Sequence, residues 1–389
     1  MTMFQPVFGS IGPGTDTLKT DEGTPVKSIY VSDSSTSDIE SLFQGKNKDD
    51  GRIETDKSVM YGKDDYSIFN GYNPGEFSVI LSALGQKYID TTSGIIHVPL
   101  DVVLVLDISG SMSVDGDGKR ADNLVKAVNK TITYLMKEDK NNRVAVVAYN
   151  TKATKILPLG RYYVGSKADY SNINSYFSVS KSSKNDGYKK LDIGKIKNES
   201  TNNLTDKASK SIEVYGATYI QDGIKQGADI LINEKTTTYT DSVSGQKVTR
   251  TPNILLLSDG CPTLGNSDYK NLASNKKFGD GSCCGSENTT DNNKEYSEND
   301  KGIFGYYTIL TAKYYKDSVS KHYNGQADHK NNKFFTVGVG VTEGEGYDYI
   351  SQVLHPTAQN LERCKNSKDP RANELHKALK KQYADNCRK

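Results

Sequence analysis

The sequence predicts an α/β protein with a doubly wound, mostly parallel sheet flanked by helices. Three observations predict this fold class. Short apolar runs recur along the chain after residue 97, amphipathic helical patterns separate them, and each run is continuous rather than alternating. Continuous runs are typical of strands that are covered on both faces, and strands that alternate with helices are typical of a parallel α/β sheet.

Four runs are the expected strands of this sheet. Each is rich in β-branched or aliphatic residues and is followed by polar ones. They are 101–106 (DVVLVL), 143–149 (RVAVVAY), 253–257 (NILLL) and 334–341 (FFTVGVGV).

Four amphipathic stretches are the expected helices. In the first, apolar residues from Ala121 to Met136 recur at the i, i+3/i+4, i+7 spacing of one helical face. Similar stripes occur at 220–231, 309–319 and 375–383. We interpret all four stripes as core-facing surfaces.

The chain divides into three expected parts. Residues 1–50 are polar, with too few large apolar side chains to fold by themselves. Residues 51–96 contain two strand-like runs, 53–61 and 76–84, which are too few for a stable domain and predict part of a β-sandwich. Residues 97–389 form the α/β domain, with long polar insertions at about 161–215, 236–251 and 265–301, the second resembling a β-hairpin.

Composition excludes several classes of function. The chain has 50 Lys+Arg and 48 Asp+Glu with a net charge of +2, so no electrostatic feature predicts binding to nucleic acid. Apolar runs reach about six residues, far below the roughly 20 that span a bilayer. We found no G-x-S-x-G elbow, phosphate-binding loop or activated nucleophile, so the sequence predicts a binding protein and not an enzyme.

Hydroxyl and carboxylate side chains cluster where the predicted strands and one helix meet. Asp107, Ser109 and Ser111 directly follow the first strand, Asp259 follows the third, and Thr218 precedes the second helix. Ligands of open parallel sheets bind at the carboxyl ends of the strands, so these five residues can converge. Three neutral oxygens and two carboxylates suit a hard cation, Mg²⁺ first, with Mn²⁺ or Ca²⁺ as alternatives.

These segments carry a family resemblance. DVVLVLDISGSM, GATYIQDGI and NILLLSDG resemble the signature segments of von Willebrand factor A (VWA) domains, which have a Rossmann-like fold and a metal-ion-dependent adhesion site. The resemblance implies that Ser109, Ser111 and Thr218 bind the metal directly, while Asp107 and Asp259 act through water or hydrogen bonds. It further implies an open metal position that accepts an acidic side chain of a protein ligand.

Two settings for such a domain stay open. Residues 49–88 resemble the stretch that precedes VWA domains in Gram-positive surface proteins and pilus-tip adhesins, which implies an extracellular host- or matrix-binding adhesin. In those proteins a Lys–Asn isopeptide crosslink is common, and Lys57 stands where such a lysine could lie, although an ordinary strand lysine is the simpler interpretation. The absence of a visible signal peptide fits either a fragment of a larger secreted protein or a cytosolic VWA domain that assembles with an ATPase.

Five cysteines leave the redox setting open as well. Cys261 can bridge to Cys283 or Cys284 beside the predicted site, and Cys364 can bridge to Cys387 near the end of the chain. Free thiols in polar loops are the alternative. An oxidising compartment favours the bridges.

Overall fold

The computed structural model describes most of the chain after residue 97. The described residues are 98–114, 119–165, 175–241, 245–279, 281, 302–325, 332–341, 343–344 and 346–386. Before residue 98 and between 289 and 296 the description is limited to the backbone of short strands.

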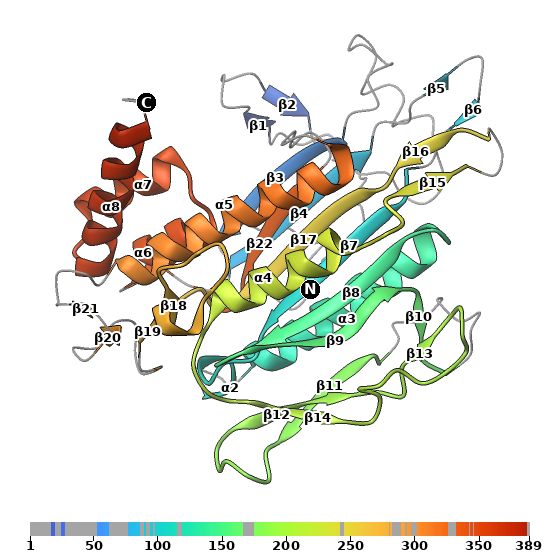
Figure 1. Cartoon of the computed structure of the whole chain (residues 1–389), viewed down its shortest axis with the longest axis horizontal. Coiled ribbons are helices and arrows are strands. Elements are labelled where there is room, and N and C mark those ends of the chain that lie inside the picture. The colour runs from blue at the N-terminus through green and yellow to red at the C-terminus, as the bar shows by residue number, and fades with distance from the viewer. Residues whose placement is uncertain are drawn as a thin grey trace. The chain divides into compact units, whose positions relative to one another are not determined.

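Five strands form the central sheet. They are β7 (Leu100–Asp107), β8 (Arg143–Tyr149), β9 (Ala153–Gly160), β17 (Thr251–Ser258) and β22 (Lys333–Gly338). Their order is β22-β17-β7-β8-β9, with parallel pairing throughout except for β9, which is antiparallel to β8 at the edge (Figure 1). The predicted doubly wound, mostly parallel fold is therefore confirmed.

The central strands are buried on both faces, as their continuous apolar runs require. All residues of β17 are buried, and so are residues 101–107 of β7. Helix α4 lies close against this sheet because Gly223 and Gly227 face it. A Cβ atom at Gly223 would lie 2.6 Å from the Tyr149 ring, and one at Gly227 would lie 2.8 Å from Val105.

Helices cover both faces of the sheet. Figure 1 shows α4 and α5 in front of the sheet and α3 behind it. Four helices match the predicted stripes: α3 (Arg120–Glu138), α4 (Ile220–Ile232), α5 (Ile303–Asn324) and α8 (Pro370–Asn386). The short helices α2 (Ser111–Val114), α6 (Tyr347–Leu354) and α7 (Ala358–Asn366) were not predicted from apolar periodicity.

The first insertion folds into small strands beside α3. These strands are β10 (Tyr162–Tyr163), β11 (Phe177–Lys181), β12 (Lys189–Ile193), β13 (Lys197–Asn198) and β14 (Ser211–Val214). β11, β12 and β14 form an antiparallel sheet. The Asn129 side chain docks it on α3, because its amide donates to the Phe177 carbonyl (2.8 Å) and accepts from the Phe177 N–H (2.9 Å).

The other two insertions contain shorter strands. β15 (Thr238–Thr240) and β16 (Lys247–Thr249) pair as the hairpin that the sequence predicts. β18 (Gly265–Asn266) pairs with β19 (Lys277–Phe278), with a 3₁₀ turn at Ser274–Lys276 between them. Of residues 280–301, only residue 281 and the pair β20 (Thr289–Asp291) and β21 (Lys294–Tyr296) belong to the described part.

Two compact units divide the chain. One contains residues 1–97 and 240–247, and the other contains residues 98–239 and 248–389. In the first unit, β3 (Ile53–Tyr61) and β4 (Phe77–Gly85) pair antiparallel, and three-stranded or larger sheets are absent among its described residues. Its other strands are the pairs β1 (Thr17–Lys19) with β2 (Pro25–Lys27) and β5 (Ile89–Asp90) with β6 (Gly94–Ile95). A completed β-sandwich and the three-part division of the chain stay predictions, and the side chain of Lys57 lies outside the described residues.

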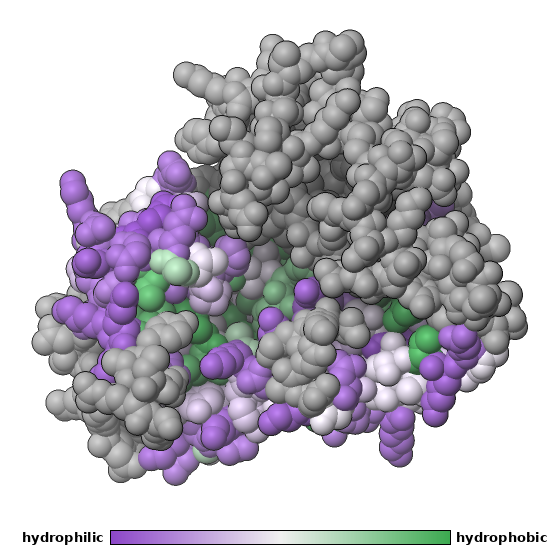
Figure 2. Space-filling view, turned by 90° about the horizontal axis from the view of Figure 1, so that it is seen from above, coloured by the Kyte–Doolittle hydropathy of each residue, from purple (hydrophilic) through white to green (hydrophobic). Residues whose placement is uncertain are grey.

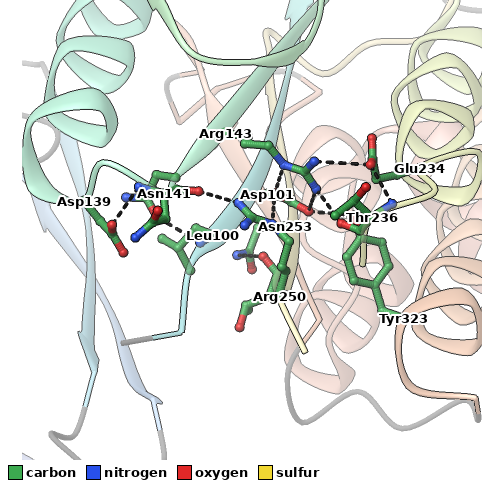
Figure 3. Close-up of polar contacts among 12 residues, drawn as sticks. Leu100, Asp101, Asp139, Asn141, Arg143, Glu234, Thr236, Arg250, Asn253 and Tyr323 are labelled. Atoms are coloured by element: carbon green, nitrogen blue, oxygen red, sulfur yellow. Dashed lines mark hydrogen bonds and ion pairs between the residues drawn. The ribbon is translucent and has the colours of Figure 1, made fainter. Parts of the chain in front are cut away.

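A buried ion-pair network lies where β7 begins. Asp101 is fully buried and accepts two hydrogen bonds from Arg143 (2.8 and 2.7 Å) and one from Arg250 (2.8 Å). The Tyr323 hydroxyl of α5 donates a further bond of 2.8 Å to the same carboxylate (Figure 3). Two arginines and a tyrosine thus satisfy one buried aspartate, which fixes the start of β7 against its neighbours.

The structure decides part of the cysteine pairing. Cys261 is disulfide-bonded, and its partner lies outside the described residues, as do Cys283, Cys284 and Cys387. Of the two alternatives left open for Cys364, a bridge to Cys387 or a free thiol, the structure has the free thiol. It is fully buried between helices, with its sulfur 3.3 Å from the Asp348 carbonyl, so the α6–α7 packing encloses it instead of exposing it for pairing.

The visible surface is mostly hydrophilic. Figure 2 shows purple side chains over most of the described surface on one face, with green hydrophobic ones between them. Among the described residues, the exposed large hydrophobic side chains are those of Val98, Leu204 and Tyr215. None of the described helices is both long enough and apolar enough to span a membrane.

Candidate metal centre

Two parallel strands bring the predicted site together at their carboxyl ends. β7 ends at Asp107 and β17 ends at Ser258, and the register pairs Leu106 with Leu257, so the two strand ends are adjacent. Asp259 follows immediately after β17. The sheet therefore places two of the predicted carboxylates at one edge, as the carboxyl-end rule for open α/β sheets requires.

Asp107 is a fully buried carboxylate held by neutral donors. Its Oδ1 accepts from the backbone N–H of Ser109 (2.9 Å), and its Oδ2 accepts from the hydroxyls of Ser258 (2.7 Å) and Tyr149 (2.8 Å). Within the described part of the chain it forms no ion pair. Burial raises the pKa of Asp107 above its usual range, and hydrogen bonds from the Ser109 side chain, Ser258, the Ser109 backbone and Tyr149 offset that effect only in part.

The Tyr149 and Ser258 hydroxyls are oriented by their own surroundings. Burial raises the pKa of Tyr149 well above its ordinary value, with the Asp107 charge as a second cause, so the phenol stays protonated and donates. The Ser258 hydroxyl accepts from the Gly260 N–H at 2.9 Å, which directs its own proton toward Asp107. Both groups fix the carboxylate without neutralising it.

The serine hydroxyls of the β7–α2 loop converge. Ser109 Oγ and Ser111 Oγ lie 3.2 Å apart, and Ser109 is fully buried while Ser111 is half-buried. The loop turns sharply after β7, with the Met112 N–H donating to the Ser109 carbonyl and the Ser113 N–H to the Gly110 carbonyl. Two neutral oxygens thus face one point directly after Asp107.

Thr218 lies between the two strand-end loops. The Gly110 N–H donates to the Gly216 carbonyl (2.9 Å), which joins the β7–α2 loop to the segment that precedes α4. On its other side, the Thr218 N–H donates to Thr263 Oγ1 (2.8 Å), and the Thr263 N–H donates to the Thr218 carbonyl (3.0 Å). Gly216 has φ +98, and a Cβ atom there would lie 2.7 Å from Thr151 Oγ1, so this turn requires glycine.

Asp259 lies at the edge of the site opposite an arginine. It is 7% exposed, and its Oδ2 lies 3.4 Å from the Arg120 guanidinium. Arg120 also reaches the carbonyl of Ser111 at 3.5 Å, so it connects Asp259 to the serine loop. Sequence analysis did not identify Arg120.

The five predicted residues therefore occupy one region, although by different kinds of contact. Side-chain or side-chain-to-backbone bonds join Asp107, Ser109 and Ser111. Thr218 and Asp259 are joined to them through backbone bonds and through Arg120. Groups of three or more His, Cys, Asp or Glu side chains are absent among the described residues. The donor set is instead hydroxyl-rich, and hydroxyl and carboxylate oxygens with room for water suit Mg²⁺.

Comparison with known proteins decides the family. The family model described as von Willebrand factor type A domain matches residues 101–380. The chain belongs to the VWA domain family. No curated protein matches the chain.

Solved structures that resemble this VWA chain are distant. They include three N-terminal domains of the type V pili tip protein Mfa5 from Porphyromonas gingivalis, at 16% identity and TM-score 0.26, covering 56% of this chain and 28% of that one. The pilus adhesin SpaC from Lactobacillus rhamnosus GG has 14% identity and TM-score 0.36, with 88% and 35% covered. The PilB minor pilin from Streptococcus sanguinis has 17% identity and TM-score 0.34, with 85% and 77% covered. The chain thus spans about a third of the length of the first two structures.

The first insertion of this VWA domain borders the serine loop. The Lys189 backbone N–H donates to Ser113 Oγ at 2.6 Å, and the Tyr188 ring lies next to Gly110. Tyr188 packs edge-to-face on Tyr215, with ring centroids 4.7 Å apart. Tyr215 is 45% exposed and directly precedes Gly216, so it presents an aromatic surface beside the candidate metal centre.

Sequence analysis also missed the two hydroxyls that hold Asp107. Ser258 stands directly before Asp259 in the SDG segment, so its place was visible but not its role. Tyr149 ends an apolar run in which a tyrosine is indistinguishable from any other core residue. Its hydroxyl contact with Asp107 depends on the parallel pairing of β7 with β8.

Proposed function

We propose that this chain is a divalent-metal-dependent adhesion module that binds a protein ligand. Ser109, Ser111 and Thr218 would hold the cation directly, and Asp107 and Asp259 would act through water or hydrogen bonds. Mg²⁺ is the expected ion, with Mn²⁺ and Ca²⁺ as alternatives. When bound, the cation would provide a ligand position for a carboxylate of the partner.

The observation that carries this proposal is the fully buried carboxyl group of Asp107. A buried carboxylate is costly unless a cation or a metal balances it. Among the described residues, Asp107 accepts hydrogen bonds from neutral donors alone, and two hydroxyls converge immediately after it. A divalent cation at the strand ends would supply the missing positive charge.

The chain's own residues prepare the site in two ways. Tyr149 and Ser258 hold Asp107 in one orientation, so the carboxylate needs little reorganisation when a cation arrives. The Gly110–Gly216 backbone bond fixes the serine loop relative to the segment that carries Thr218. Preorganisation of this kind raises affinity by lowering the entropy lost on binding.

A cell-surface setting is favoured over a cytosolic one. Cys261 is disulfide-bonded and lies two residues after Asp259. Disulfides form and persist in oxidising compartments and are rare in the cytosol. We therefore propose an extracellular adhesin domain, whose ligand is a host or matrix protein, in preference to an assembly partner of an ATPase.

The first insertion is proposed to select the ligand. Tyr215 and Tyr188 form an aromatic surface next to the serine loop, and tyrosine provides large contact area at low entropic cost. In this scheme the metal contacts an acidic side chain of the ligand, and the tyrosines determine which ligand is bound.

Calorimetric titration tests the proposed function. Mg²⁺ and Mn²⁺ are added to chelator-treated wild type and to the Asp107→Ala and Ser109→Ala variants. We expect saturable binding near one equivalent in wild type and its loss in both folded variants. No binding by folded wild type would contradict a metal-dependent function.

A further inference from the structure

Arg120 places a fixed positive charge at the edge of the candidate metal centre. It is the first residue of α3, and its side chain is 25% exposed. Its guanidinium contacts three segments of the site: the carboxylate of Asp259 at 3.4 Å, the carbonyl of Ser111 at 3.5 Å and the carbonyl of Gly340 at 3.2 Å. Those segments follow β17, β7 and β22 respectively.

The backbone leaves room for this side chain. Gly340 has φ +68, and a Cβ atom there would lie 2.5 Å from Arg120 Nε. A side chain at residue 340 would therefore displace the arginine from its place across the strand ends. Glycine at this position permits the guanidinium to lie directly against the β22–α6 connection.

The contacts of Arg120 are long for a charged group. Charge-assisted N–H···O bonds usually measure about 2.7–2.9 Å, as the bonds from Arg143 and Arg250 to Asp101 do. The contacts of Arg120 with Asp259, Ser111 and Gly340 all exceed 3.1 Å, and the group is partly exposed. The Arg120–Asp259 contact is thus longer than the contacts of the arginines at the other end of β7.

A guanidinium and a divalent cation compete for the same carboxylate. Arginine stays protonated under all ordinary conditions, so its charge cannot be removed by a proton equilibrium. Two cations near one partly buried carboxylate repel each other, and the low local dielectric strengthens this repulsion. Metal binding through Asp259 must therefore weaken or move the Arg120 contact.

We propose that Arg120 is a tethered counter-ion that lowers the affinity of the site for divalent cations. The proposal rests on the proposed function, since it presumes that Asp259 takes part in metal binding. Because the same guanidinium contacts the Gly340 carbonyl, its release upon metal binding also frees the segment after β22. Arg120 is a positioning residue in this scheme and not a metal ligand.

The test is a Mg²⁺ titration of the full chain by calorimetry, with chelator-treated wild type and Arg120→Gln. Lys126→Gln is the matched control, because Lys126 is an exposed cation on the same helix. Arg120→Met, which keeps an unbranched aliphatic stem without the charge, is the second variant if Arg120→Gln fails to fold. We expect Arg120→Gln to bind Mg²⁺ at least about ten-fold more tightly than wild type, and Lys126→Gln to bind like wild type.

The outcomes separate this inference from the proposed function. Tighter binding by Arg120→Gln than by wild type supports it. Equal or weaker binding by folded Arg120→Gln and Arg120→Met, with wild type still binding, overturns the role of Arg120 and leaves the metal centre standing. An equal increase in the Mg²⁺ affinity of Lys126→Gln would show that the effect comes from the net charge of the chain. That result would also overturn the proposal. An absence of binding in every folded variant rejects the metal centre itself, and the inference with it.

Discussion

Strand β7 carries one fully buried aspartate at each end, and the two carboxylates have opposite surroundings. At the start of the strand, Asp101 is bound by two arginines and a tyrosine (Figure 3). At its end, Asp107 is bound by a backbone amide, a serine and a tyrosine. As far as the structure describes the chain, the same strand therefore has one carboxylate with protein cations around it and one without.

This difference separates stability from binding. Arg143 and Arg250 neutralise Asp101 permanently, so that end of the sheet needs nothing from outside the chain. Asp107 is fully buried and forms no ion pair with the described residues, which is the arrangement that an external cation would stabilise. The proposed metal centre makes the carboxyl end of β7 the functional end, and the ion-pair network makes the amino end the structural one.

The largest expected effect tests the structural end. Asp101→Asn leaves two arginines beside a neutral amide, and breaking a buried ion pair by removing one partner costs about 3–5 kcal/mol. We expect the free energy of unfolding in urea to fall by that amount, with or without Mg²⁺. A loss below about 1 kcal/mol would contradict the structural role of the network.

Asp107→Asn tests the functional end and is the matched control for Asp101→Asn. In chelator we expect the free energy of unfolding to change by less than about 1 kcal/mol, because the amide keeps the shape and removes an unbalanced charge. Wild type should gain about 2.7 kcal/mol at a Mg²⁺ concentration 100 times its Kd, whereas Asp107→Asn should gain nothing. A strong destabilisation in chelator would mean that both aspartates serve the fold.

Tyr215→Ser tests whether ligand selection is separate from the metal. The Tyr215 side chain is exposed, so we expect its replacement to leave the free energy of unfolding and the Kd for Mg²⁺ within about two-fold of the wild-type values. For a matrix protein that wild type binds in the presence of Mg²⁺, the affinity of Tyr215→Ser should be about ten-fold lower, as expected for the loss of an aromatic contact. Tyr239→Ser, a tyrosine of the β15–β16 hairpin, serves as the control. An equal loss in both variants would argue against a role for the first insertion.

Cys364 is a third buried ionisable group, after Asp101 and Asp107. Of the effects predicted here, we expect that of Cys364 to be the smallest. Burial raises the pKa of its thiol from 9.0 to about 12, so the folded protein keeps it neutral. In the unfolded chain the thiol ionises when the pH exceeds its ordinary pKa. Its contribution to the free energy of unfolding is therefore present below pH 9 and is lost as the pH rises toward 12. We expect Cys364 to resist iodoacetamide at pH 8 until urea unfolds the protein. Rapid alkylation of the folded chain would show that the α6–α7 packing opens easily.

The fold could be predicted in outline because burial leaves a clear pattern. The four parallel strands are continuous apolar runs, and the four longer predicted helices show a periodic stripe. β9 was not predicted, since an antiparallel edge strand is only partly buried and its residues alternate imperfectly. Helices α6 and α7 are eight and nine residues long, too short for periodicity to distinguish them from loops.

The candidate site could be predicted only as far as its motif reaches. Asp107, Ser109 and Ser111 are neighbours in sequence, and Thr218 and Asp259 stand in recognisable segments. Arg120 contacts Asp259 and Gly340 across 139 and 220 positions of sequence, which no local pattern reveals. For the same reason Asp101 was taken as the first residue of an apolar run, since Arg250 approaches it from 149 positions away.

The most direct test of the central claim is a crystal of the chelator-treated chain soaked in Mn²⁺, with data collected at the manganese absorption edge. The account predicts one strong anomalous peak at the carboxyl end of β7, at coordination distance from the hydroxyls of Ser109 and Ser111 and absent from Asp107→Asn crystals. A peak elsewhere, or no peak in a wild-type crystal with Arg120 still bound to Asp259, would contradict it.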